Sequence, residues 1–261
     1  MSHDIKKNKL LKKFLGLFGF KILPKDTVKT ERIIESYTFN CSDLIKFLVN
    51  EKKIDQIIQV GANDGKSDDF LRNSINKNTK VLLVEPIKSA FLELKKNYSD
   101  YNNVEFINKA LDIKQGKKKI YSVNPDYYEN YKKKYESNDV SWLTVLASFE
   151  KDHLINHGIK KNHIHSVDVD CITFNDLILQ YNFDKLGLLV MDTEGYDSVL
   201  VKDFIENSKL RPVIIFEWIH MKKEIAENII NLLKVNNYEL IKINKDLICF
   251  QNNFLFSKHN N

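Results

Sequence analysis

The sequence predicts an α/β fold in which helices cover both faces of a mainly parallel sheet. Apolar runs typical of buried strands occur at residues 56–60, 80–85, 186–192 and 212–217, and helical patterns separate several of them. Strands that alternate with helices join through right-handed crossovers and so build a parallel sheet. The chain has 261 residues, of which 43% are hydrophobic and 29% charged, and this is the balance of one large globular domain.

Residues 1–40 are expected to form an appendage, and residues 41–261 the main domain. Apolar residues at helical spacing from Leu10 to Phe18, with lysines beside them, predict a basic amphipathic helix that breaks near Pro24. We favour docking of this helix on its own domain or on a second copy of the chain, as in a homo-oligomer. The alternative is peripheral contact with an anionic membrane surface.

The expected location of the protein is the cytoplasm. No apolar run is long enough to cross a bilayer, and no signal peptide pattern is present. The three cysteines are widely spaced and show no pairing typical of metal ligands. Such cysteines are typical of a reducing compartment.

The first strand of the main domain ends in a glycine turn. A helix is expected from Ser42 to about residue 51, because the serine side chain can hydrogen-bond the free amides of the first turn. The strand at 56–60 then runs into the sequence GANDGK. Gly61 lets the chain reverse, and Gly65 lets the backbone approach a ligand where a polar helix is expected from about Asp68.

The second strand ends in an acidic residue. Glu85 follows the glycines by about 20 residues, where a carboxylate can accept hydrogen bonds from two ribose hydroxyls. A helix near 90–98 and a third strand over 104–111 are expected next. The turn has neither the spacing of a P-loop nor the third glycine of a dinucleotide fingerprint, which disfavours polyphosphate. The structural alternative is an ordinary βα turn beside a solvated glutamate.

The alternation of strands and helices stops at an insertion of about residues 121–163, which is rich in tyrosine, lysine and asparagine. Just before it, DIKQGKKKIYSV predicts a hairpin. His153 and His157 stand at i, i+4 spacing but have no acidic partner at matching spacing, which disfavours a zinc site. One of the histidines is an alternative catalytic base. The tyrosines and Trp142 either stack on sugar faces as a lid or pack within the insertion.

After the insertion the regular pattern resumes. HSVDVDCITF predicts a strand, and a helix is expected near 175–181. A later helix near 222–235 precedes two strands that flank the Asn244–Lys245 turn. The domain therefore ends in an antiparallel pair attached to a parallel sheet.

With these elements in place, the chain resembles the class I S-adenosylmethionine-dependent methyltransferases and, more narrowly, the FkbM family. The matching segments are IIQVGANDGK, VLLVEP, VEFINKAL, LLVMDTEGYDSVLV and PVIIFE, over about residues 55–218. The resemblance implies a Rossmann-like, seven-stranded, mostly parallel sheet with its last strand antiparallel and helices on both faces. It also implies O-methylation of a hydroxyl on a sugar or sugar-linked small molecule, in surface polysaccharide or glycoconjugate biosynthesis.

The resemblance also implies which residues hold S-adenosylmethionine. These residues belong to the glycine turn and to the ends of four strands, and they are Gln59, Gly61, Ala62, Asn63, Asp64, Gly65, Glu85, Pro86, Asn108, Ala110 and Asp192. An aspartate is common in the family at the position of Gln59. The glutamine can hydrogen-bond the cofactor's ammonium group but supplies no negative charge, and Asp64 is the residue that would compensate.

Two mechanisms fit the polar residues at the ends of the later strands. In the one that we favour, Asp192, Glu217 or His220 takes the proton of the acceptor hydroxyl without a metal. In the other, Asp192, Glu194 and Glu217 hold a magnesium ion, which lowers the pKa of the hydroxyl. Glu194 alternatively serves only as a carboxylate at a helix start.

Two other classes of function remain as alternatives. A non-catalytic, methyltransferase-like binding module would need no cluster of polar residues at the strand ends. An RNA methyltransferase is disfavoured because the sequence shows no [ND]PP[FY] motif and no RNA-binding appendage. We therefore expect a small-molecule or sugar acceptor and no nucleic-acid partner.

Overall fold

The computed structural model describes residues 41–66, 69–135, 141–219 and 221–252. The predicted N-terminal helix and His220 lie outside these ranges. In the described part of the chain, no helix combines the length and the apolar character needed to cross a membrane.

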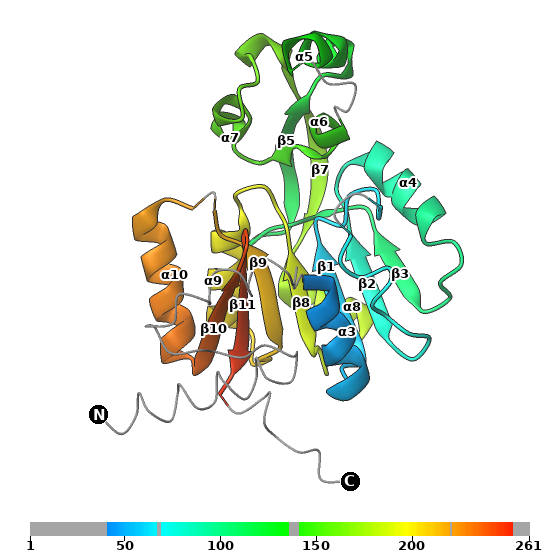
Figure 1. Cartoon of the computed structure of the whole chain (residues 1–261), viewed down its shortest axis with the longest axis vertical. Helices are drawn as coiled ribbons and strands as arrows, with labels where there is room; N and C mark the ends of the chain where they lie inside the picture. Colours follow the sequence, from blue (N-terminus) through cyan, green and yellow to red (C-terminus); the bar gives the residue numbers. More distant parts are fainter. Residues whose placement is uncertain (1–40, 67–68, 136–140, 220, 253–261) are drawn as a thin grey trace, which may run out of the picture.

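The main sheet has seven strands in the order β10-β11-β9-β8-β1-β2-β3 (Figure 1). Its strands are β1 (Gln56–Val60), β2 (Lys80–Val84), β3 (Val104–Ile107), β8 (Leu188–Met191), β9 (Val213–Glu217), β10 (Tyr238–Ile243) and β11 (Asp246–Gln251). The pairs among β3, β2, β1, β8 and β9 are parallel, whereas β11 is antiparallel to both β9 and β10. The predicted mostly parallel sheet with its last strand antiparallel is confirmed.

Helices cover both faces of this sheet. They are α3 (Cys41–Glu51), α4 (Lys88–Asn97), α8 (Phe174–Tyr181), α9 (Asp197–Asn207) and α10 (Lys223–Val235). Successive strand residues point to opposite faces, so Ile57 belongs to the apolar cluster that contains residues of α3 and α4, while Ile58 belongs to the cluster that contains residues of α8, α9 and α10. The strands read as continuous apolar runs because both of their faces are buried.

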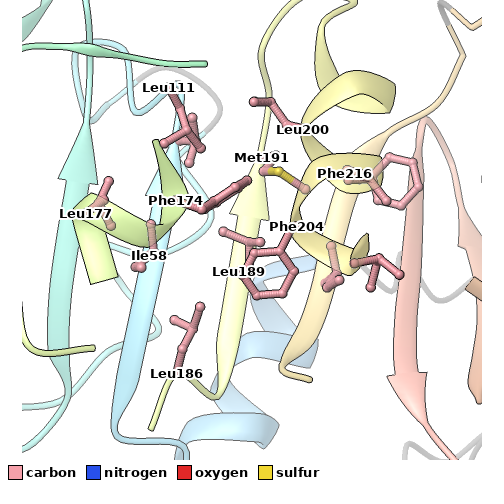
Figure 2. Packing of buried hydrophobic residues seen from close by; sticks show 14 of the residues in the cluster. Ile58, Leu111, Phe174, Leu177, Leu186, Leu189, Met191, Leu200, Phe204 and Phe216 are labelled. Atoms are coloured by element: carbon pink, nitrogen blue, oxygen red, sulfur yellow. The ribbon is translucent and has the colours of Figure 1, made fainter. Parts of the chain in front are cut away.

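The apolar core under α8 and α9 is built around two phenylalanines. The Phe174 and Phe204 rings meet edge to face, with their centroids 4.9 Å apart. Figure 2 shows them beside Leu189 and Met191 of β8. All four side chains are buried, so apolar packing fixes the position of β8 and of the residues that follow this strand.

The segment between β1 and β2 differs from the prediction. No helix occurs among its described residues, so the polar helix expected from about Asp68 is wrong there. The Asp69 carboxylate accepts hydrogen bonds from the backbone of Leu71 and from the Tyr98 hydroxyl, at 2.8 and 2.6 Å. These bonds fix turns in which the side chain of Leu71 is fully buried.

The strand expected over residues 104–111 is confirmed only as far as Ile107, where β3 ends and the chain leaves the main sheet. The Asn108 side-chain amide donates to the carbonyl oxygens of Glu85 and Pro86, at 2.8 and 2.9 Å, and marks this departure. A second sheet then begins, with the order β4-β7-β5-β6. Its strands are β4 (Ala110–Leu111), β5 (Gly116–Val123), β6 (Ala147–Ser148) and β7 (Ile164–Ile172).

The hairpin predicted from DIKQGKKKIYSV does not form, because β7 lies between the two strands that it would pair. β7 is parallel to β4 and antiparallel to β5, and the pairing with β5 runs from Gly116–Cys171 to Val123–Ile164. This long pairing joins segments on the two sides of the insertion. It outcompetes a local hairpin because it makes many more hydrogen bonds than the two-residue β4 can offer.

Residues 124–135 and 141–163 form a cap that stands on β5 and β7 above one end of the main sheet (Figure 1). Its helices are η1 (Pro125–Tyr127), α5 (Tyr128–Tyr135), α6 (Ser141–Val145), α7 (Lys151–Asn156) and η2 (Lys161–His163). Tyr131 and Leu154 belong to a small apolar core of the cap, and Tyr127 stacks on His163 with 3.9 Å between ring centroids. These tyrosines therefore pack within the insertion.

Candidate active site

A cavity with about 1020 Å³ of empty space, part of it open to solvent, lies at the carboxyl ends of β1, β2 and β8. This edge of a parallel sheet is where α/β proteins bind ligands. The end of α6, β6 and the residues beside them supply one wall, through Thr144, Val145, Ala147, Ser148 and Phe149. The cavity therefore lies between the sheet and the cap.

The glycine turn after β1 forms the floor of the cavity. Gly61 has φ +77°, and a Cβ atom there would lie 1.8 Å from the carbonyl oxygen of Asp192. Only glycine permits this contact between the turn and the end of β8. Gly65 also has positive φ, but its nearest neighbours are Leu94 and Tyr98, so its close approach is to α4 and its neighbouring residues and not to the cavity.

Gln59, at the end of β1, is 5% exposed and lines the cavity. Its Oε1 atom is buried, and no described residue donates a hydrogen bond to it. A buried acceptor without a donor costs about 1 to 3 kcal/mol. A ligand that brings an N–H group would remove this cost.

Glu85 joins the glycine turn to the end of β2. Its two carboxylate oxygens accept hydrogen bonds from the backbone N–H groups of Asn63 and Ile87, at 2.9 and 2.7 Å. Burial raises the pKa of Glu85 to about 7, although both hydrogen bonds favour the charged form. Each oxygen keeps a second lone pair that can accept a bond from a ligand hydroxyl.

Of the remaining residues predicted to hold the cofactor, Ala62, Pro86 and Ala110 line the cavity. Asp64 and Asn108 do not. The Asp64 carboxylate accepts a hydrogen bond from a backbone N–H two residues further on, and the Asn108 amide bonds two carbonyl oxygens. Both side chains shape the loops that carry the lining residues.

The carboxylates of Asp192 and Glu217 both lie close to the ammonium group of Lys245. The Lys245 Nζ lies 3.9 Å from Asp192 Oδ2 and 3.5 Å from Glu217 Oε1. Burial, together with the charges of Glu194, Asp197 and Glu217, raises the pKa of Asp192 well above its usual range, and Lys245 opposes this shift. Asp192 and Lys245 both line the cavity, whereas Glu217 is buried beside them.

The sequence does not mark Lys245 as a site residue, because Asn244–Lys245 reads as a hairpin turn. The antiparallel pairing of β11 with β9, which aligns Asp246 with Glu217, brings this turn to the carboxyl end of β9. The one available signal is topological: an antiparallel last strand must start where its parallel neighbour ends.

The three carboxylates expected to hold magnesium do not form one group. Among the described residues, Glu194 instead joins His153 and His157, and the three ligand atoms all lie within 4.8 Å of one another. The Glu194 Oε2 lies 2.9 Å from His153 Nε2, so this carboxylate turns toward the cap. The acidic partner of the histidines, which their spacing in the sequence does not reveal, is therefore Glu194, 41 positions after His153.

Solved structures with similar chain traces include several methyltransferases. An O-methyltransferase from Bacillus cereus in complex with SAH is 10% identical, with a TM-score of 0.43, over 94% of this chain and 90% of that chain. Cofactor-bound Rv0187 from MTB is 9% identical, with a TM-score of 0.43, over 88% and 84%. The Methanococcus jannaschii fibrillarin pre-rRNA processing protein is 11% identical, with a TM-score of 0.38, over 75% and 65%.

No curated protein matches the sequence. The model of the methyltransferase FkbM domain, in contrast, matches residues 59–240. The match begins at Gln59 and includes the glycine turn, Glu85, Asp192 and Glu217. The fold is the Rossmann-like, class I methyltransferase fold, and since the match extends over more than half of the sequence, the chain belongs to the FkbM methyltransferase family.

Proposed function

We propose that this methyltransferase transfers a methyl group from S-adenosylmethionine to a hydroxyl of a sugar or sugar-linked small molecule, in surface polysaccharide or glycoconjugate synthesis. The observation that carries the proposal is the Asp192–Lys245 pair, which opens into the same cavity as the glycine turn. One cavity thus offers a cofactor surface and a proton acceptor. The sugar class of the acceptor follows from the family resemblance.

The lining residues fit S-adenosylmethionine. The Oε1 atom of Gln59 is a buried acceptor that matches an ammonium donor, and the Glu85 carboxylate matches ribose hydroxyls. Pro86, Ala110 and Leu111 add apolar lining suited to adenine. When bound, the cofactor supplies an electrophilic methyl group on its sulfonium.

Asp192 is the residue that we assign as the general base. Its raised pKa makes it a stronger proton acceptor than an ordinary aspartate, which suits removal of a hydroxyl proton. Lys245 stabilises its charged form, and Glu217 holds the lysine from the other side at 3.5 Å. Phe149 and Tyr196, whose rings meet edge to face at 5.0 Å, add aromatic surface to the lining of the cavity.

The first test is calorimetric titration of the purified chain with S-adenosylhomocysteine, with NADH as the control. We expect micromolar binding of S-adenosylhomocysteine and no binding of NADH. Failure of S-adenosylhomocysteine to bind the folded protein would overturn the assignment of the cofactor.

The second test uses methyl-labelled S-adenosylmethionine with pools of sugar acceptors and with RNA, for the wild type and Asp192→Asn. We expect label in the sugar fraction, and a loss of turnover of at least about tenfold in Asp192→Asn while S-adenosylhomocysteine binding stays within a few fold. Label in RNA alone would replace the sugar by a nucleic acid. Binding without transfer to any pool would favour the binding module, and unchanged turnover would remove Asp192 from the mechanism.

A further inference from the structure

We propose that His153, His157 and Glu194 bind one divalent transition-metal ion of the zinc class. The ion would fasten α7 of the cap to the loop that follows β8, beside the cavity. Two of the ligands come from the cap, and the third comes from the loop after the central strand. The proposal depends on neither the acceptor nor the methyl transfer.

The three side chains are close enough to share an ion. Their ligand atoms lie within 4.8 Å of one another, and the His153 Nε2 lies 2.9 Å from Glu194 Oε2. Tetrahedral zinc holds its N and O ligands at about 2.0 to 2.1 Å, so the ligand atoms stand about 3.3 Å apart. The 2.9 Å between His153 Nε2 and Glu194 Oε2 is already close to this separation.

The residue types match a known coordination chemistry. Two histidines and one glutamate form a zinc set that leaves a fourth position for water or a ligand. His153 and His157 are four residues apart, so they share one side of α7 and its C-terminal end, and their ring centroids are 4.4 Å apart.

The tautomer of His157 decides which of its ring nitrogens can bind a metal. Its Nδ1 atom lies 2.9 Å from the carbonyl oxygen of His153. A carbonyl oxygen only accepts hydrogen bonds, so Nδ1 carries the proton, and the lone pair of the ring is on Nε2. Metal-bound histidines typically have their other nitrogen held in this way.

The loop after β8 is shaped to meet the cap. Glu194 has φ +50°, and its carbonyl oxygen accepts a 2.7 Å hydrogen bond from the Ser148 hydroxyl. Gly195 has φ +93°, and a Cβ atom there would lie 3.0 Å from His153 Nδ1, so the glycine leaves room for the imidazole. The His153 and Glu194 side chains are 9% and 22% exposed, which shields the site yet leaves access for an ion.

A metal-free explanation also exists, and it predicts something different. The His153–Glu194 contact can close the cap as a hydrogen bond, and His157 is no part of that bond. Removal of His157 therefore separates the two explanations. A metal site loses a ligand, whereas the hydrogen bond keeps both its donor and its acceptor.

The test is titration of the EDTA-treated full chain with Zn²⁺, together with Co²⁺ absorption spectra and the metal content of the protein as purified. We expect one Zn²⁺ per chain and the visible bands of tetrahedral Co²⁺. His157→Ala should weaken Zn²⁺ binding by at least about tenfold, as loss of a ligand or of its support does. His157→Gln is the second variant, which retains side-chain volume.

The matched control is His165→Ala, which removes a histidine that bonds Ser122 at the base of the cap. It should bind Zn²⁺ like the wild type. Wild-type protein that is folded but binds no Zn²⁺ would overturn the proposal, and so would unchanged affinity in both His157 variants. Zn²⁺ binding is read without methyl transfer, so its failure is distinguishable from failure of the proposed function.

Discussion

Gly61 has no room for a side chain, because its hypothetical Cβ atom meets a backbone oxygen. We predict that Gly61→Ala lowers the free energy of unfolding by at least about 2 kcal/mol, since alanine is strained at φ +77° and also collides with Asp192 at 1.8 Å. Urea denaturation measures the loss. Gly116→Ala is the control, because Gly116 has φ +136° with no atom within 4 Å of its Cβ position. Equal losses in the two variants would contradict the importance of the contact.

Glu85 should make the stability of the protein depend on pH. Its pKa rises from 4.5 to about 7 on folding, so the folded state binds its proton more tightly than the unfolded state. The stabilisation is present below pH 4.5 and is lost as the pH rises through about 7, and it amounts to about 3 kcal/mol.

In Glu85→Gln, the fall in unfolding free energy between pH 4.5 and 7.5 should be smaller by about that amount. The glutamine lowers stability at every pH, because its NH₂ group faces a backbone donor, and so the slope is the relevant readout. Asp197, whose pKa is also raised to about 7 by burial, contributes equally in both proteins. Parallel slopes would contradict the assignment to Glu85.

At the scale of elements, the cap has a core of its own. Leu154 is 0% exposed in a cluster that shares no residue with the clusters under the main sheet. We predict that Leu154→Ala, which creates a cavity worth about 2 to 5 kcal/mol, raises hydrogen exchange in the cap while β1, β2 and β8 stay protected. Leu189→Ala, in β8, is the control and should weaken protection throughout. Loss of protection in the sheet of Leu154→Ala would show that cap and sheet unfold together.

At the scale of the whole molecule, the cavity is lined by residues from the ends of the first strands and of the central strand, from the final hairpin and from the cap. A ligand bound there should stabilise all of these parts at once. We predict that S-adenosylhomocysteine at 100 times its Kd raises the unfolding free energy by about 2.7 kcal/mol and Tm by roughly 5 to 10 °C. Differential scanning fluorimetry measures the shift, and NADH at equal concentration should produce none. An unchanged Tm with S-adenosylhomocysteine would argue against the cofactor.

The sequence by itself determined the parallel sheet, its strands and the residues at their ends. Strands buried on both faces must be apolar throughout, so the runs that end at Val60, Glu85, Asp192 and Glu217 are visible without a structure. The glycine turn is visible for a similar reason, because the backbone there tolerates no side chain. These features are local, and a local pattern is what a sequence displays.

Only the tertiary structure decided which distant residues meet. Three contacts join segments that are far apart in the chain. They are the pairing of β7 with both β4 and β5, the contact of Lys245 with Asp192, and the contact of Glu194 with His153. Polar residues in turns carry no periodicity that reveals their partners. Their positions follow from how strands pair and how the cap packs, which is the sum of many contacts and is not a property of any one segment.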